Sequence, residues 1–403
     1  MGFERLQRAL AGLEDSGLRR QLQEMQGAQA RALCHQGREY LNFSSNNYLG
    51  LADHPALCEA MARGLREWGV GSGAARLVTG SQAPAHRLEE ALAAFKGGEA
   101  ALLFNSGYHA NLGALSCLVG EGDTIFSDAL NHASMIDGMR LSHAKKIVYR
   151  HNDAGDLREK LSGARKIAAP GAQFLIASET VFSMDGDLAP LHDLLRLAEE
   201  FDAWLYLDEA HATGVFGPTG AGLFESIADR GRYADRVIQM GTLGKALGCF
   251  GAYVAGPRVL VDFLINRARP FIYTTALPPA LAEAAREALR LVAQEPERRS
   301  ALWERVRQFD GGSGKAVSPI VPILVGGADA ALKLSRDLRE RGFWVSAIRP
   351  PTVPEGTARL RVTLMATHRE ADVAALKEVL ENLGARGDAN AREGEGGPLP
   401  RPR

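Results

Sequence analysis

The stretch GTLGKALGCFGAY, residues 241–253, places a single lysine, Lys245, inside a glycine-rich turn. The segments before and after it, DRVIQMG and GAYVAG, have the composition of buried strands, so the turn directs the lysine toward the interior. An amine in such a place loses hydration, which lowers its pKa and makes it a better nucleophile. This lysine could therefore form a Schiff base with an aldehyde.

Two further polar residues, Asp208 and His211, follow the apolar run of residues 203–207. A carboxylate at the end of a buried strand is costly unless a cation meets it, and a protonated heterocyclic nitrogen is one candidate. The alternative is an aspartate that caps the next turn. The motif alone does not decide between the two.

Three other strand ends have polar residues with the same ambiguity. Gly107 opens a helix directly after the strand AALLF, so its N–H group could bind an anion, or the segment could be an ordinary turn. His132 follows the strand DTIFSD and could equally be a surface histidine. Glu179 and Ser183 follow the strand QFLIAS, where a cap or a loop hydrogen bond also explains them.

Taken together, these groups meet the requirements of one cofactor, pyridoxal phosphate. The amine suits its aldehyde, the helix start suits its phosphate, the aspartate suits its pyridinium nitrogen, and a histidine can lie over its ring. One cofactor explains the residues more economically than several unrelated local roles.

The elements that must position these residues form a regular pattern. From about residue 100, short apolar strands alternate with helical segments, which predicts a mostly parallel sheet buried on both faces. Ligands of such sheets bind at the carboxyl ends of the strands. The candidate residues all follow predicted strands, so we expect them to meet at one edge of the sheet.

The chain is long enough for two domains. We expect an N-terminal helical arm over residues 1–45, a large domain over 46–281, and a smaller α/β domain over 282–386 that opens with one long helix, 281–309. The segment 387–403 is rich in glycine, proline and charge, which is typical of disorder.

Composition excludes several functions. The chain has 403 residues, with 47 lysines and arginines against 48 aspartates and glutamates, so no basic surplus favours nucleic acid or anionic membranes. Its four cysteines are scattered, which predicts reduced thiols in a cytoplasmic protein and no metal site. The start MGFERLQRAL is unlike a signal peptide, and no apolar run approaches the ~18 residues of a membrane span.

The motifs TLGKALG, DEAHATGVFG, VFSMDGDLAPL, SGYHAN and IYTTALPPA resemble those of the α-oxoamine synthases. These are pyridoxal-phosphate enzymes of fold type I, with an aspartate-aminotransferase-like architecture. The similarity runs from about residue 20 to 385. The segment 348–364, IRPPTVPEGTARLRVTL, most resembles members that form 8-amino-7-oxononanoate. Where the family often has Asn-Asp-Tyr, this chain has Asn at position 47, which affects no catalytic role.

The resemblance assigns roles around the cofactor ring. Lys245 would be the Schiff-base lysine, and Asp208 would face the pyridinium nitrogen. His211 would hydrogen-bond the phenolate oxygen, while His132 would stack on the ring. Lys245, His132 and Asp208 would be the catalytic residues.

It also assigns the phosphate and substrate contacts. Gly107 and Tyr108 would offer backbone N–H groups to the phosphate and Thr242 its hydroxyl, with Ser183 close to the cofactor. The family is an obligate homodimer, so either Thr274 or Thr275 would reach the neighbour's phosphate. Arg349 and Thr352 would meet the substrate carboxylate or acyl group, and Arg19 or Arg20 would also contact substrate. His132 would be a substrate contact as well.

The implied reaction is the decarboxylative condensation of L-alanine with a pimeloyl thioester, in biotin biosynthesis. The acyl carrier could be coenzyme A or an acyl-carrier protein. One alternative is a sister enzyme that uses glycine with an acetyl or succinyl thioester. A second is an inactive partner subunit, which would be expected to lack the lysine. The loop GVGSGAARLVTGS, residues 69–81, follows a predicted helix, so we expect it at the site and dimer interface and not as a dinucleotide loop.

Overall fold

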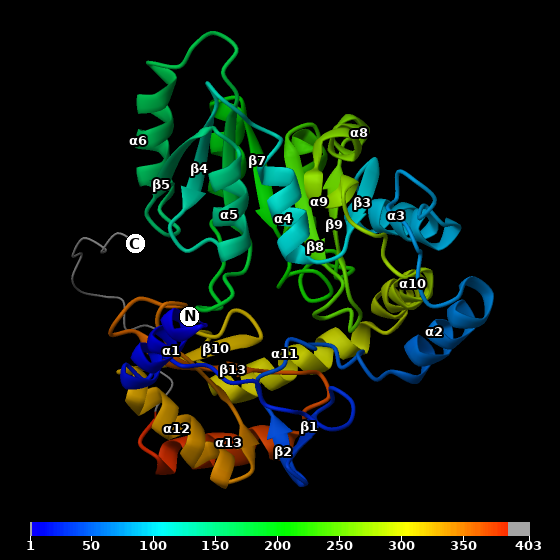
Figure 1. The fold of residues 1–403 in the computed structure, drawn as a ribbon. Coiled ribbons are helices and arrows are strands. Elements are labelled where there is room, and N and C mark those ends of the chain that lie inside the picture. Colours follow the sequence, from blue (N-terminus) through cyan, green and yellow to red (C-terminus); the bar gives the residue numbers. More distant parts are fainter. Residues whose placement is uncertain (1, 386–403) are drawn as a thin grey trace.

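The computed structural model describes residues 2–385, and its largest element is a seven-stranded sheet (Figure 1). The strand order is β3-β9-β8-β7-β6-β4-β5. Strand β9 runs opposite to the other six strands, which all point the same way. Each strand lies where the sequence predicts it, which confirms the mostly parallel sheet. The strands are β3 (Ala100–Phe104), β4 (Thr124–Asp128), β5 (Lys145–Tyr149), β6 (Phe174–Glu179), β7 (Ala203–Asp208), β8 (Val237–Thr242) and β9 (Ala252–Gly256).

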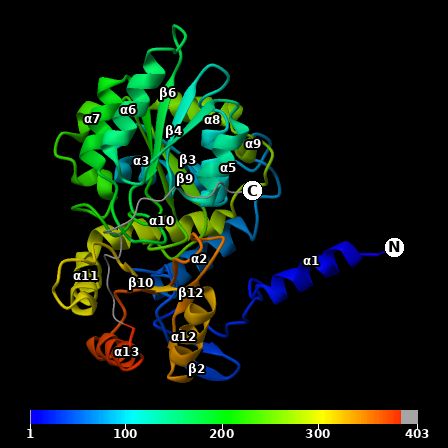
Figure 2. The same cartoon turned by 90° about the vertical axis from the view of Figure 1, so that its left-hand side faces the viewer.

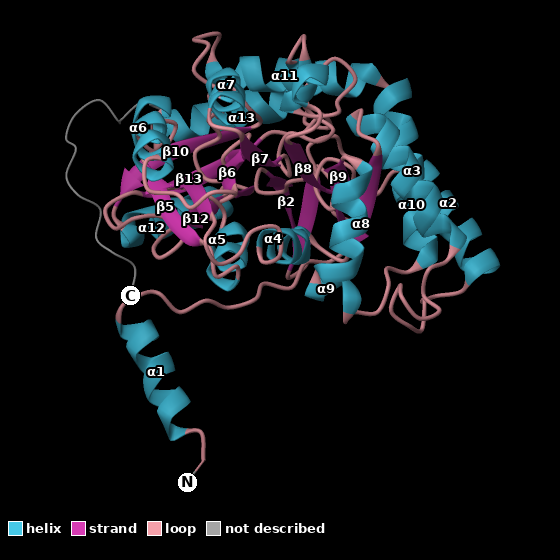
Figure 3. Cartoon of the chain, turned by 90° about the horizontal axis from the view of Figure 1, so that it is seen from above, coloured by secondary structure: helices cyan, strands magenta, loops and turns pink. Residues whose placement is uncertain are grey.

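Helices cover both faces of this sheet (Figure 3). Strand β6 shows why, because Leu175 and Ala177 join one apolar cluster while Phe174 and Ile176 join another on the opposite face. Apart from the exposed edge strand β5, the sheet is thus covered on both faces, so the polar side chains of its buried strands collect at the strand ends. The helices on one side are α4 (Gly107–Leu115), α5 (Ala133–Leu141) and α8 (Arg258–Arg267), and those on the other are α6 (Ala154–Arg165) and α7 (Leu191–Glu200).

A smaller part of the molecule lies below the large sheet in Figure 1 and contains two three-stranded sheets. The first has the order β10-β13-β12 and is antiparallel throughout. The second pairs the hairpin β1-β2 with β11. The elements are β1 (Ala32–His35), β2 (Arg38–Asn42), β10 (Ile320–Gly326), β11 (Phe343–Trp344), β12 (Ser346–Ile348), β13 (Ala358–Thr363), α12 (Ala328–Glu340) and α13 (Glu370–Asn382).

The prediction of one long helix over 281–309 is wrong. Helix α10 (Pro279–Gln294) ends before Glu295, whose φ of −118° and ψ of 61° are not helical, and α11 (Pro296–Asp310) follows. Pro296 explains the break, because it has no N–H to donate and it crowds the residue before it.

The N-terminal segment is more than a helical arm. Helix α1 (Glu4–Asp15) projects from the body and buries none of its residues (Figure 2), whereas the chain beyond it enters the β1-β2 hairpin. The domain boundaries at residues 45 and 281 remain predictions. The segment predicted to be disordered, 387–403, lies outside the described residues. No helix within residues 2–385 is long and apolar enough to cross a bilayer.

Candidate active site

Lys245 lies in the turn between β8 and β9, as the sequence predicts. Gly248 shows why the turn needs glycine: its φ is +66°, and a Cβ atom there would lie 2.5 Å from the backbone of Leu51 and Ala52. The Lys245 side chain is half-buried, and its Nζ atom lies 2.8 Å from Nε2 of His211. Burial lowers the pKa of this amine to about 8, although the charge of Asp208 opposes the shift. Lys245 is thus partly neutral near neutral pH.

Asp208 is the last residue of β7 and is 4% exposed. Its carboxylate accepts hydrogen bonds from Nδ2 of Asn111 at 2.8 Å and from the N–H of Ala210 at 2.9 Å. Among the described residues, no lysine, arginine or histidine forms an ion pair with it. The carboxylate is thus buried, oriented and without a cation.

His211 lies between the lysine and a tyrosine. Its Nδ1 atom is 2.7 Å from the hydroxyl of Tyr48, and its Nε2 atom faces Lys245. Burial lowers the pKa of His211 well below its usual value, and the charges of Lys245 and Arg361 lower it further. The ring is therefore neutral, and its tautomer depends on these two partners.

His132 forms the N-cap of α5. The N–H of Ser134 donates to Nδ1 of His132 at 3.2 Å, and the Ser134 hydroxyl lies 2.7 Å from the same atom. Because an N–H can only donate, Nδ1 is an acceptor and the neutral ring has its proton on Nε2. Desolvation by the surrounding protein lowers the pKa of His132, which favours this neutral form.

A hydrogen-bonded network joins His132 to Asp208. Asn111 donates to both Asp208 and the Ser134 hydroxyl, at 2.8 and 2.9 Å, and it accepts from Tyr206 at 2.8 Å. The sequence alone did not indicate a role for Asn111, Ser134 or Tyr206. No pattern marks them, because each lies inside an otherwise ordinary helix or strand.

The expected phosphate region surrounds the start of α4. Ser106 caps this helix, so the N–H groups of Gly107 and Tyr108 have no intrahelical partner. A Cβ atom at Gly107 would meet only Met240, at 4.0 Å, so the space in front of the helix is open. The hydroxyl of Thr242 donates to the Gly251 carbonyl at 3.0 Å, and a bound phosphate would have to compete for that proton.

Glu179 ends β6 directly beside Asp208 in the sheet register. It is buried, and its Oε2 atom accepts from the N–H of Ser183 at 3.2 Å. Burial raises the pKa of this carboxyl group well above its usual value, and the charge of Asp208 raises it further. Burial and the neighbouring Asp208 therefore favour the protonated form of Glu179.

Arg361 on β13 also enters this site, and the sequence analysis missed it. Its Nε atom donates to the Ser183 carbonyl at 2.6 Å, and Nη1 donates to Oδ1 of Asn46 at 3.1 Å. The side chain is buried, yet no carboxylate among the described residues pairs with it. Its neighbour on the strand, Arg359, pairs instead with Asp185 at 2.6 Å. The sequence did contain a sign of this site, because two arginines in an otherwise apolar strand are unusual.

The expected substrate residues form a second cluster. Nη2 of Arg349 donates to the Arg19 carbonyl at 2.9 Å, and Nη2 of Arg20 lies 3.4 Å from the Thr352 hydroxyl. The Arg19 side chain instead pairs with Glu14 at 2.6 Å. The structure thus brings these segments together and places Arg20, not Arg19, against Thr352.

Thr274 and Thr275 lie beside Asn105 of their own chain. Nδ2 of Asn105 donates to the Thr274 hydroxyl at 3.2 Å and to the Thr275 carbonyl at 3.0 Å. Thr275 also forms a β-bridge with Ala75 in the loop 69–81, which follows helix α2 (Pro55–Trp68). Because a helix and not a strand precedes this loop, it has no dinucleotide-binding context.

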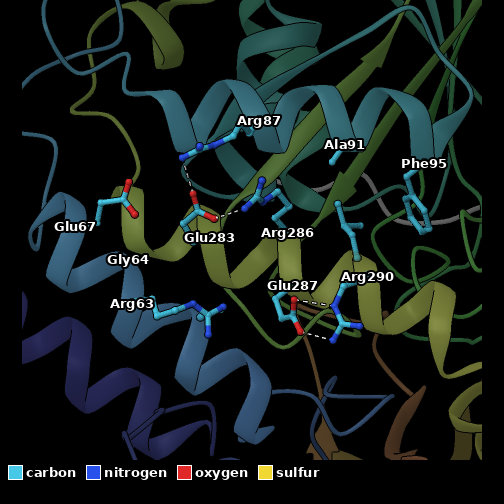
Figure 4. Close-up of a pocket in the computed structure, with 12 residues that line it drawn as sticks. Arg63, Gly64, Glu67, Arg87, Ala91, Phe95, Glu283, Arg286, Glu287 and Arg290 are labelled. Atoms are coloured by element: carbon cyan, nitrogen blue, oxygen red, sulfur yellow. Dashed lines mark hydrogen bonds and ion pairs between the residues drawn. The ribbon is translucent and has the colours of Figure 1, made fainter.

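A large cavity, about 630 Å³, lies elsewhere, between α2, α3 (Ala83–Lys96) and α10 (Figure 4). Its walls have ion pairs between arginines and glutamates, including Arg87 with Glu283 at 2.9 Å and Arg290 with Glu287. None of the strand-end residues lines it. The cavity is therefore distinct from the candidate active site.

Comparison with known proteins identifies relatives over almost the whole chain. Residues 38–380 match a family described as aminotransferase class I and II. A protein of Methylococcus capsulatus named 8-amino-7-oxononanoate synthase is 53% identical over 352 residues, which is 85% of this chain and 89% of that protein.

Two solved structures are similar to this chain over most of its length. Serine palmitoyltransferase from S. paucimobilis, solved with pyridoxal phosphate and myriocin bound, has a TM-score of 0.86 and 29% identity, covering 95% of this chain and 97% of its own. The 8-amino-7-oxononanoate synthase of Francisella tularensis has a TM-score of 0.71 and 31% identity, covering 86% and 98%.

Proposed function

The chain belongs to the class I and II aminotransferase family and, within it, to the α-oxoamine synthases, and from this premise we propose the reaction and its residues. It is a pyridoxal-phosphate-dependent acyltransferase that condenses L-alanine with a pimeloyl thioester to give 8-amino-7-oxononanoate, CO2 and a free thiol, a step of biotin biosynthesis. The observation that supports this most strongly is the cluster of the half-buried Lys245 with the buried His211 and Asp208. It occurs in a chain that is 53% identical to a protein named 8-amino-7-oxononanoate synthase.

The residues of the strand ends fit the cofactor. Asp208 is a buried carboxylate without a cation, which suits a ring N–H, and the open space before Gly107 suits a phosphate. When bound, pyridoxal phosphate withdraws electrons from the substrate's α-carbon. We assign Lys245 as its covalent anchor, Asp208 as the partner of its nitrogen, His211 as the partner of its ring oxygen and His132 as the ring's stacking residue.

The phosphate would be held mainly by backbone groups. Gly107 and Tyr108 would offer their free N–H groups at the positive end of α4, and the Thr242 hydroxyl would turn from Gly251 toward the phosphate. Ser183 would lie next to the cofactor, where Glu179 fixes its N–H.

Lys245 is also suited to move the substrate's α-proton. An amine with a pKa of about 8 can accept a proton at neutral pH and return it later in the cycle. Its half-buried position holds it close to the reacting carbon and limits the access of water. We assign it as the general base and acid of the reaction.

The amino-acid carboxylate would bind Arg361. This arginine is buried, has no carboxylate partner among the described residues, and is oriented by Ser183 and Asn46. The cluster of Arg349, Thr352 and Arg20 would meet the acyl substrate, and the geometry favours Arg20 over Arg19 for that role.

We further propose a homodimer in which Thr275 of a second copy approaches the phosphate. Helix α1 supports it, because Phe3 and Leu6 are 79% and 55% exposed and no residue of the helix is buried. The four free cysteines agree with a cytoplasmic location.

Product identification tests the reaction directly. The purified protein, loaded with pyridoxal phosphate, is incubated with alanine or glycine and with pimeloyl-coenzyme A, a pimeloyl acyl-carrier protein, acetyl-coenzyme A or succinyl-coenzyme A. Mass spectrometry should find 8-amino-7-oxononanoate only from alanine with a pimeloyl donor. A glycine product would make the chain a sister synthase. No product, together with no pyridoxyl label on Lys245 after borohydride reduction, would indicate an inactive subunit.

A further inference from the structure

Tyr48 connects the two ends of the candidate site. Its side chain is fully buried, and its hydroxyl lies 2.7 Å from Nδ1 of His211 and 3.1 Å from Oδ1 of Asn46. The same Asn46 oxygen accepts from Arg361, and the other nitrogen of His211 faces Lys245. An unbroken row of hydrogen-bonding groups therefore runs from the anchoring lysine to the carboxylate-binding arginine.

The hydroxyl has one proton for two acceptors, which restricts this row to two arrangements. In the first, the Lys245 ammonium donates to Nε2 of His211, Nδ1–H donates to the Tyr48 oxygen, and Tyr48 donates to Asn46. In the second, Tyr48 donates to Nδ1, so the His211 proton is on Nε2 and can be donated toward the cofactor. Asn46 then accepts from Arg361 alone.

We propose that Tyr48 is a positioning residue that sets the tautomer of His211, and that it couples the state of Lys245 to the Asn46–Arg361 pair. The role of the cofactor in this inference rests on the proposed function. A free lysine ammonium selects the first arrangement, whereas the cofactor-bound lysine, which has no ammonium to donate, selects the second. Without the hydroxyl, Nδ1 of His211 would have no partner in this buried setting. Only the group at Nε2 would then act on the tautomer, which weakens the preference for either form.

The wild-type protein tests this without any mutation. Nitrogen-15 NMR of ring-labelled histidine, with the His211 signals assigned by their loss in His211→Gln, reports which ring nitrogen is protonated. At pH 7, we expect Nδ1–H in the cofactor-free protein and Nε2–H in the loaded protein. The same tautomer in both states would overturn the coupling.

Tyr48→Phe removes only the hydroxyl oxygen. We expect the loaded variant to show both His211 tautomers and kcat to fall about tenfold, the scale of one lost hydrogen bond. Tyr253→Phe is the matched control, because Tyr253 is equally buried and its hydroxyl lies 3.0 Å from that of Thr213, not from His211. The control should keep a single tautomer and wild-type kcat.

The outcomes separate this inference from the proposed function. A Tyr48→Phe protein with one tautomer and unchanged kcat would refute the role of Tyr48. If alanine and pimeloyl-coenzyme A give no product, the proposed reaction fails, but the NMR result, obtained without substrate, still decides the tautomer. If Tyr48→Phe does not fold, the comparison of the two wild-type states decides it alone.

Discussion

The strand-end site and the cavity between α2, α3 and α10 are both rich in charged side chains, but the charges are arranged differently. In the cavity Glu283 meets both Arg87 and Arg286, and Glu287 meets Arg290, on partly exposed helix faces (Figure 4). At the strand ends, neither Asp208 nor Arg361 has an ionic partner among the described residues, and both are buried.

The contrast separates a ligand site from a solvated surface. Exposed ion pairs are neutralised by each other and by water, so they need no further partner and add little stability. A buried, unpaired charge is unfavourable unless something outside the chain completes it. The two buried side chains without an ionic partner, Asp208 and Arg361, are therefore a better indication of function than the cavity. The following predictions test that distinction.

The largest effect should follow Lys245→Ala. Without the amine, the protein would lack the proposed covalent anchor of the cofactor and the proposed group that moves the α-proton, so turnover should fall by roughly 10³-fold or more. Product formation and the visible absorbance of the loaded protein measure this. Lys333→Ala, which removes a lysine that is 71% exposed and paired with Asp337, is the control and should be unaffected.

Arg361→Ala should mainly weaken alanine binding. Removing one partner of a desolvated charge pair costs about 2–5 kcal/mol, so KM for alanine should rise roughly 100-fold. Arg361→Lys should recover part of the loss, because it keeps the charge but not the two-pronged geometry. An unchanged KM for alanine would remove Arg361 from the substrate site.

The pKa of Lys245 predicts a pH profile. Only the neutral amine reacts with an aldehyde, so the rate at which cofactor-free protein captures pyridoxal phosphate should rise with pH and level off above about pH 8. The charge of Arg361 helps to lower this pKa, so Arg361→Ala should move the midpoint to higher pH. Stopped-flow absorbance gives the profile. A midpoint near the ordinary lysine value would contradict the structure.

A smaller effect is expected at His151, a half-buried ring that has two carboxylate partners. Its ring lies 2.9 Å from Asp128 and 2.7 Å from Asp187, and these carboxylates outweigh burial and raise its pKa to about 9. Because the folded-state pKa is raised, the stabilisation is fully present below the unfolded pKa of ~6.5 and is lost as pH rises through about 9.

His151→Gln should therefore lower the free energy of unfolding by roughly 2 kcal/mol at pH 6 and by much less at pH 10. Urea denaturation at the two pH values measures the difference between variant and wild type. A gap that does not change with pH would mean that the ring packs but is not charged.

The smallest effect should follow Arg290→Ala in the cavity wall. The ion pair with Glu287 is an i,i+3 pair whose arginine is 48% exposed, so its loss should move the melting temperature by no more than about 1–2 °C. Steady-state kinetics should be unchanged. A marked loss of activity would show that the cavity, and not only the strand ends, takes part in the reaction.

The sequence was sufficient for the large sheet and for the residues at its strand ends. Each buried strand is a short apolar run, and polar residues such as Asp208 and His211 stand out where a run stops. Parallel connectivity then places those ends at one edge. The break before Pro296 was predicted wrongly as one long helix, although proline rarely continues a helix and so marked the position.

The remaining site residues could not be predicted from spacing. Tyr48 and Arg361 are more than 300 residues apart in the chain, yet both reach Asn46. Only tertiary packing brings them together. Tyr48 has no local pattern that marks its function, and the two arginines in the buried strand β13 do not show what Arg361 contacts. Asn111 is similar, since a single asparagine inside a helix gives no sign that it orients a carboxylate from another element.

Val181 and Leu188 form an antiparallel bridge, and the hairpin between them makes contacts on two sides. On one side, Arg361 of β13 donates to the Ser183 carbonyl and Arg359 pairs with Asp185. On the other side, Asp187 contacts His151, which follows strand β5 of the large sheet. These contacts link the hairpin both to the small sheet and to the large sheet. A carboxylate bound at Arg361, as proposed, would therefore act on a side chain that is hydrogen-bonded to the Ser183 carbonyl, and the Ser183 N–H is in turn bonded to Glu179 at the end of β6.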